Sequence, residues 1–127
     1  MCSEKDDKPL DIRLVEEWLE NFFLDPLTSF LDETIFRIDL FETADEFIVE
    51  AMLFQCNKCD ITVRLEHENI IIGVENKQQQ ENVKQRIISF PFSVIQHDVK
   101  ANFESGILEI FISKYTICNG DNREIAL

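Results

Sequence analysis

Apolar side chains recur near the start of the chain at intervals of one, three and four residues. The set over residues 11–23 consists of Leu14, Val15, Trp18, Leu19, Phe22 and Phe23. Glutamates fall on the opposite side, so the spacing predicts an amphipathic helix. We expect Asp11 to cap this helix and Asp25-Pro26 to end it, because proline disfavours helical geometry in the residue before it. Apolar residues then continue over 27–31 in a less regular stretch.

From residue 35 the period of the apolar positions changes from 3.6 to 2, which indicates β-strands. Strands are expected at residues 36–40, 47–53, 61–65, 70–75, 86–90, 100–104 and 107–114. Ser105-Gly106 predicts a tight hairpin before the last strand, because glycine adopts positive φ at no steric cost. Short strands at this spacing, with no helix between them, predict an all-β fold, an antiparallel immunoglobulin-like β-sandwich.

The chain beyond residue 114 is polar, and Asn119-Gly120-Asp121-Asn122 is typical of a flexible linker. It leads to Ile125-Ala126-Leu127, an apolar, small, apolar triplet with no local core to join. Such a triplet either frays or docks elsewhere. The pattern therefore divides the chain into an N-terminal arm (residues 1–34), a β-sandwich domain (35–114) and a C-terminal tail (115–127).

Residues 101–112 contain, in order, Ala101, Gly106, the aliphatic-Leu pair Ile107-Leu108 and an alternating strand. This order resembles the closing signature of the α-crystallin domain in the small heat-shock (Hsp20) family. Three further segments resemble that family in the same order: Ile38-Asp39-Leu40-Phe41-Glu42-Thr43, Cys59-Asp60-Ile61-Thr62-Val63 and Phe90-Pro91-Phe92-Ser93-Val94. The resemblance spans residues 36–114 and implies the same sandwich, with Gly106 and Leu108 as structural residues of its hairpin.

The terminal Ile125-Ala126-Leu127 is similar to the family's C-terminal I-x-I/V anchor, with Leu in the last place. The resemblance implies that Ile125 and Leu127 anchor the tail on the sandwich edge of a neighbouring protomer. The groove that accepts them is carried over by position to Ile61, Val63, Leu65, Ala101 and Phe103. An edge strand with unpaired backbone groups favours such docking on physical grounds too, and an accidental frayed end is the alternative.

Two features depart from the family pattern. The connection at residues 76–84 is too short for the strand that the family exchanges between subunits, and Phe54-Gln55 stands where a Pro-Gly turn is usual. With Trp18-Leu19 and Phe22-Phe23-Leu24-Asp25-Pro26 upstream, the chain is similar to the α-crystallin-like proteins of bacterial spore coats.

The resemblance implies a homo-oligomer and leaves more than one function open. As a holdase, the chain binds unfolding client proteins without ATP, through Trp18, Phe22, Phe23, Phe30 and Leu31 of the arm. As a structural protein, it assembles with other coat proteins into a spore coat. The tail anchor disfavours a third hypothesis, a co-chaperone that binds one defined partner. The apolar face of the arm helix can also pack on the chain's own domain, and we favour its contact with other protein chains.

Charge and composition limit the partners. The chain of 127 residues carries 25 acidic and 12 basic residues, a net charge of -13 that disfavours nucleic acids and anionic membranes. No apolar run reaches the roughly 20 residues that span a bilayer, and the N-terminus lacks a secretory signal pattern. We therefore expect an intracellular protein, of the cytoplasm or of the spore coat.

Candidate chemistry is sparse. Cys56-Asn57-Lys58-Cys59 supplies at most two of the four ligands of a structural zinc site, and no helical pattern follows it to lower a thiol pKa. His67 and His97 have no nucleophile motif near them, and three glycines are too few for a phosphate-binding loop. We expect no enzyme activity, metal or cofactor. The cysteines either have no role or cross-link an assembly, together with Cys2 and Cys118.

Overall fold

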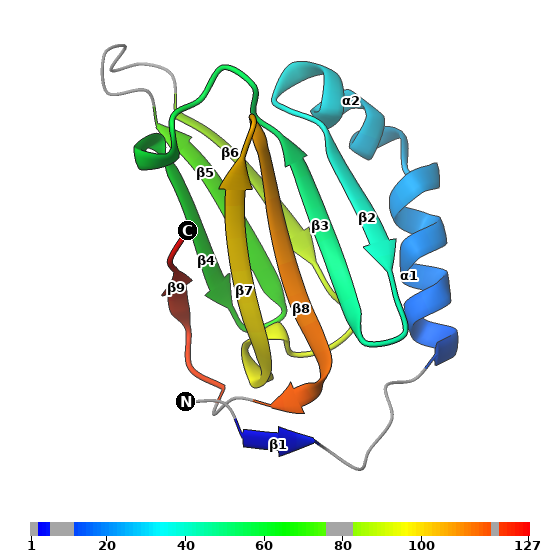
Figure 1. Cartoon of the computed structure of the whole chain (residues 1–127). Coiled ribbons are helices and arrows are strands. Elements are labelled where there is room, and N and C mark those ends of the chain that lie inside the picture. The colour runs from blue at the N-terminus through cyan, green and yellow to red at the C-terminus, as the bar shows by residue number, and fades with distance from the viewer. Residues whose placement is uncertain (1–2, 6–11, 76–82, 118–119) are drawn as a thin grey trace.

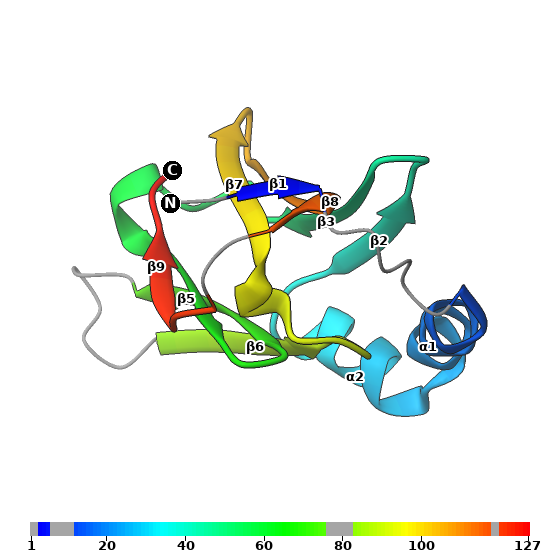
Figure 2. The ribbon, with the colours of Figure 1, turned by 90° about the horizontal axis from the view of Figure 1, so that it is seen from below.

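The computed structural model describes residues 3–5, 12–75, 83–117 and 120–127 of the chain. Two antiparallel β-sheets face each other, and helices lie along one open side of the resulting sandwich (Figures 1 and 2). The structure confirms the predicted antiparallel β-sandwich with an N-terminal helix. The C-terminal strand lies on the opposite side of the sandwich from the helices (Figure 1).

The first sheet is built around its longest strand, β8 (Ile107–Ile117). β8 pairs with β3 (Glu46–Met52) on one side and with β7 (His97–Glu104) on the other. β2 (Ile38–Glu42) pairs with the outer side of β3, and the short β1 (Ser3–Lys5) pairs with the C-terminal end of β8. β2 and β3 are thus the opening hairpin that the alternating pattern predicts.

The second sheet has the strand order β6-β5-β4-β9 in the described part of the chain. Its strands are β4 (Ile61–Glu66), β5 (Asn69–Glu75), β6 (Val83–Ser89) and β9 (Arg123–Ile125). Two short 3-10 turns, η1 (Lys58–Asp60) and η2 (Val94–Gln96), precede β4 and β7. β9 is formed by the tail, so the tail is the outermost strand beside β4.

The core lies between the two sheets and is filled by alternate side chains of the strands. β3 and β4 bury every second residue, as the period of two predicts, and Val49 and Val63 are 0% exposed. β5 departs from this alternation because Ile70, Ile71 and Ile72 are all buried. This strand is therefore covered on both faces along that stretch.

The hairpin between β7 and β8 turns at Ser105 and Gly106, as predicted, with φ angles of 54° and 81°. Gly106 lies against Phe54 so closely that a Cβ atom on it would come within 2.8 Å of the Phe54 Cα atom. Its carbonyl oxygen accepts a hydrogen bond from the backbone N–H of Leu53 at 2.8 Å. Glycine therefore supplies both the left-handed conformation and the space that this contact needs.

The arm contains two helices, α1 (Ile12–Leu24) and α2 (Pro26–Thr34). α1 agrees with the helix expected over residues 11–23, and its proposed cap Asp11 lies outside the described residues. The expectation that residues 27–31 are less regular is wrong, because α2 covers them. The dipeptide that ends α1 also begins α2: Asp25 Oδ1 accepts the backbone N–H of Leu27 at 2.9 Å, and proline is tolerated in the first helical turn.

We expect Asp25→Ala to lower the free energy of unfolding by about 1 kcal/mol, because it removes the N-cap of α2. Urea denaturation followed by circular dichroism measures this loss. Asp25→Asn is the matched control, because asparagine caps helices as well as aspartate does. Equal losses for the two variants would show that the side chain does not act as a cap.

Candidate functional site

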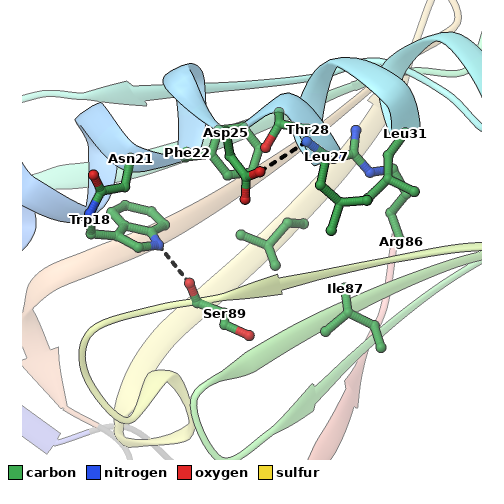
Figure 3. Close-up of a pocket in the computed structure, with 11 residues that line it drawn as sticks. Trp18, Asn21, Phe22, Asp25, Leu27, Thr28, Leu31, Arg86, Ile87 and Ser89 are labelled. Atoms are coloured by element: carbon green, nitrogen blue, oxygen red, sulfur yellow. Dashed lines mark hydrogen bonds between the residues drawn. The ribbon is translucent and has the colours of Figure 1, made fainter.

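The inner side of α1 packs on the chain's own sandwich. Trp18 donates its indole N–H to the carbonyl oxygen of Ser89 at 2.6 Å (Figure 3). Its ring centroid lies 4.7 Å from that of Phe90, and it meets Phe47 edge-on at 6.3 Å. Val15 is buried, and Phe22 is half-buried against the same core. This side of α1 therefore packs on the chain's own domain.

The arm also carries large apolar side chains that are exposed. Four side chains form what we call the apolar ridge: Phe23, Leu24, Leu27 and Phe30 are exposed by 51%, 71%, 56% and 59%. They come from the end of α1 and the first part of α2, on both sides of the Asp25-Pro26 junction. Large apolar side chains are normally covered in a water-soluble fold, so four exposed together indicate a contact surface.

A cleft of about 270 Å³ lies beneath the ridge, between the two helices and β6 (Figure 3). Leu27 and Leu31 line it from α2, and Ile87 lines it from β6 with 52% of its surface exposed. Arg86 on the same strand is only 3% exposed, and its guanidinium donates to the carbonyl oxygen of Phe36 at 3.0 Å. This bond ties β6 to the segment that leads from α2 into β2, and it fixes the floor of the cleft.

The arm residues that the sequence suggested for client binding therefore divide into two groups. Trp18 and Phe22 pack on the sandwich and line the cleft together with Leu31, whereas Phe23 and Phe30 are exposed. Sequence reasoning did not include Leu24, Leu27 or Ile87 in this surface. Leu27 belonged to the recognised apolar stretch. In the pair Ile87-Ile88 one side chain must point outward from a strand, but the sequence does not say which.

The tail lies on the opposite side of the sandwich. β9 pairs antiparallel with β4, with Ile125 opposite Val63, and β9 also contacts β7. Ile125 and Leu127 are half-buried and pack against the core. Of the residues that the resemblance assigned to the groove, Ile61, Val63 and Leu65 on β4 are buried, and Ala101 and Phe103 on β7 are half-buried. The tail thus lies along the residues to which the resemblance assigned the groove.

The thiols of the CxxC motif do not form a reactive pair. Cys59 is exposed, and its thiol lies 3.8 Å from Asp60 Oδ1. Burial, and then the negative charge of Asp60, raise the pKa of the Cys56 thiol, so this thiol stays protonated at neutral pH.

No three potential metal ligands converge within the described ranges, and His97 Nδ1 contacts the carbonyl oxygen of Ser113 at 2.8 Å. None of the helices in the described part of the chain is long and apolar enough to cross a membrane.

Comparison with known proteins shows clear relatives. No protein-family profile matches the chain. Spore coat protein M of Bacillus subtilis (strain 168) is 33% identical over 106 residues, which cover 84% of this chain and 78% of that protein. Small heat shock protein C2 of Rickettsia felis (strain ATCC VR-1525 / URRWXCal2) is 26% identical over 115 residues, which cover 80% of this chain and 75% of that protein.

Among solved structures, the Del-C4 mutant of hsp14.1 from Sulfolobus solfatataricus P2 is 28% identical, with a TM-score of 0.56 over 79% of this chain and 96% of that one. Its fold agrees with the two-sheet sandwich described above. The identity to spore coat protein M extends over most of both chains. This chain therefore belongs to the small heat-shock (Hsp20/α-crystallin) family, and it is similar to spore coat protein M.

Proposed function

We propose that this protein is an ATP-independent holdase, which binds apolar segments of unfolding proteins on the apolar ridge and in the cleft beside Ile87. The observation that carries the proposal is the exposure of Phe23, Leu24, Leu27 and Phe30 on the two helices of the arm. Hydrophobic contact is not directional, so one ridge can accept many different unfolded segments. No nucleotide is needed for such binding, because burial of apolar surface drives it.

The size of the ridge fits reversible binding. Burying one large apolar side chain completely contributes roughly 1.5–3 kcal/mol, so each half-exposed ridge residue contributes about 1 kcal/mol. Four such residues give about 4 kcal/mol before the cost of association, so a single ridge binds a client no more tightly than about 1 mM. We propose that self-assembly raises this weak affinity, because several ridges in one oligomer bind one client. The net charge of -13 keeps the resulting complexes apart in solution.

Light scattering from a heat-aggregating test protein, without ATP, tests the proposal. We expect the wild-type chain to suppress the scattering at an equimolar ratio. The triple variant Phe23→Gln, Leu27→Gln, Phe30→Gln should lose most of this protection, because the ridge becomes polar. Glutamine has a good helix propensity, so the arm keeps its fold. Deletion of the whole arm is a poorer test, because Trp18 belongs to the packed core.

The matched control is Phe41→Gln, which changes an aromatic residue that is 47% exposed on β2, outside the arm. This control should protect the test protein as well as the wild type does. A triple variant that protects fully, or a control that fails equally, would contradict the assignment of the ridge as the binding surface. Circular dichroism of each variant establishes that it is folded.

A second candidate function rests on the similarity to spore coat protein M. In this alternative the same ridge builds a permanent layer of the spore coat with other coat proteins, and client binding is incidental. The scattering assay separates the two functions. A folded wild-type chain that leaves the scattering undiminished favours the structural function.

A further inference from the structure

The outer face of the first sheet carries apolar side chains where a water-facing sheet normally carries polar ones. No other element of the described chain lies on this face (Figures 1 and 2). On β3 and β8 the outward side chains of Ile48, Met52, Ile107 and Phe111 are half-buried. Ile48 lies directly opposite Phe111, and Met52 lies opposite Ile107. These two apolar rows depart from the usual alternation and indicate a contact surface.

Two carboxylates lie between the apolar rows. Glu50 on β3 is directly opposite Glu109 on β8, and like charges in this position destabilise a sheet. Asp39 on β2 is next in the same row and forms an ion pair with Arg37 at 3.3 Å. Neither Glu50 nor Glu109 forms an ion pair within the described part of the chain. We call the following six residues the acidic face: Ile48, Glu50, Met52, Ile107, Glu109 and Phe111.

Negative charge continues beyond one end of the acidic face. A hollow of about 280 Å³ adjoins Phe111, and Asp45, Glu46 and Asp98 line it. Lys100 is among the lining residues too, so three carboxylates accompany one ammonium group there. Charges across a protein interface are complementary in sign, so this surface favours a cationic partner.

The partner has to satisfy its own backbone. β3 pairs with β2 and β8, and β8 pairs with β3 and β7, so both strands of the acidic face are already paired on both sides. An extended segment laid over them would find no backbone partners, whereas a helix bonds its own N–H and C=O groups. Rows of the sheet lie about 7 Å apart, because two residues separate them along a strand. Helical residues four positions apart share a face at a spacing of about 6 Å, so a helix can match all three rows.

We propose that the acidic face binds an amphipathic helix of another protein, which presents an arginine between two aliphatic residues at positions i, i+4 and i+8. The aliphatic side chains contact the two apolar rows, and the arginine lies between Glu50 and Glu109. A guanidinium presents several donors in one plane, so it can bond both carboxylates, and its charge removes their repulsion. The inference does not depend on the holdase proposal, because the ridge lies on the arm and binding there needs no charge.

Fluorescence anisotropy with a labelled peptide tests the proposal on the full chain. The probe is a helical peptide of about 18 residues, rich in alanine and glutamine, with Leu, Arg and Leu at positions i, i+4 and i+8. In its isomer the arginine exchanges places with the residue at i+6, which turns the arginine about 200° away from the leucines. The isomer keeps the composition and the charge of the probe. The wild-type chain should bind the probe about tenfold more tightly than the isomer.

The variant Glu50→Gln, Glu109→Gln should bind the probe about tenfold more weakly than the wild type does. The matched control is Glu16→Gln, Glu20→Gln, which removes the same charge from exposed positions on α1 and should leave binding unchanged. Equal weakening in both variants would overturn the inference, because attraction by the net charge would then account for binding. Equal affinity of the wild type for probe and isomer, or no binding of the probe, would also overturn it.

Two further measurements separate the acidic face from a folding defect and from the ridge. Glu50 and Glu109 repel each other in the free chain, so replacing both with glutamine should leave the melting temperature unchanged or raise it. A lower melting temperature would contradict the unfavourable pairing on which the inference rests. The triple ridge variant should bind the probe as the wild type does. Loss of binding in that variant would place the probe on the ridge and would refute the proposed site.

Discussion

Trp18→Ala should lower the free energy of unfolding by about 3 kcal/mol and release the helical arm from the sandwich. The indole is the largest side chain that joins the arm to the core, and it extends an aromatic cluster. Within that cluster the rings of Phe47 and Phe92 stack at 5.4 Å, and those of Phe90 and Phe92 also lie 5.4 Å apart. Removing the indole leaves a cavity over these rings and deprives the Ser89 carbonyl of its donor.

Two controls separate these contributions. Trp18→Phe keeps an aromatic ring but loses the N–H donor and part of the ring volume, so it should cost about 1–2 kcal/mol. Phe23→Ala removes an exposed aromatic side chain from the same helix and should change stability by less than about 0.5 kcal/mol. Urea denaturation measures all three values. A loss below about 1 kcal/mol for Trp18→Ala would show that the arm is not held by this contact.

Release of the arm should lower stability but improve the suppression of aggregation. The freed arm exposes Phe22, and its departure uncovers Phe90 on the sandwich. Apolar surface is thereby exposed in addition to the ridge, and the cleft opens so that its apolar lining on the arm and on β6 becomes accessible. We therefore expect Trp18→Ala to suppress the aggregation of a test protein at a lower ratio than the wild type, at a temperature where the sandwich stays folded. Amide hydrogen exchange in α1 reports the release independently.

The strands of the sandwich could be predicted from the sequence because each inward position is fixed by a period of two. Val49 and Val63 fall on that period, and both are fully buried. Side chains on α1 are harder to assign. Trp18 and Phe23 are both aromatic residues of one amphipathic helix, yet one is packed and the other exposed. The apolar face of this helix is wider than the surface that the sandwich offers, and only the packed structure shows where that surface ends.

The second helix and the contacts of Arg123 were missed for different reasons. Proline disfavours helical geometry in the residue before it, so Asp25-Pro26 ends α1. Proline is also tolerated in the first turn of a helix, so the same dipeptide begins α2. The sequence does not show that both effects apply at this one place. Arg123 is a single basic residue in a polar segment, which carries no local signal of structure. Its guanidinium donates to the carbonyl groups of Ile95 and His97, which lie about 30 residues earlier and turn toward it only in the folded chain.

Gly106→Ala should lower the free energy of unfolding by about 2–5 kcal/mol, because it meets two separate obstacles. Alanine at a φ of 81° costs about 1–2 kcal/mol. Its Cβ atom would also lie 2.6 Å from Phe54 Cδ1 and 2.8 Å from the Phe54 Cα atom. The ring can rotate away, but the Cα atom belongs to the backbone and moves only if the hairpin shifts, at a further cost of about 1–3 kcal/mol.

The neighbouring residue, Ser105, provides a control that should not lower the free energy of unfolding. Ser105 has a φ of 54° without being glycine, and asparagine tolerates this conformation better. Ser105→Asn should therefore leave stability unchanged or raise it by about 0.5 kcal/mol. Urea denaturation of the two variants separates the backbone requirement of the turn from the contact with Phe54. A loss of only about 1 kcal/mol for Gly106→Ala would mean that the hairpin shifts freely. The close approach of Gly106 to Phe54 would then not be what requires glycine at this position.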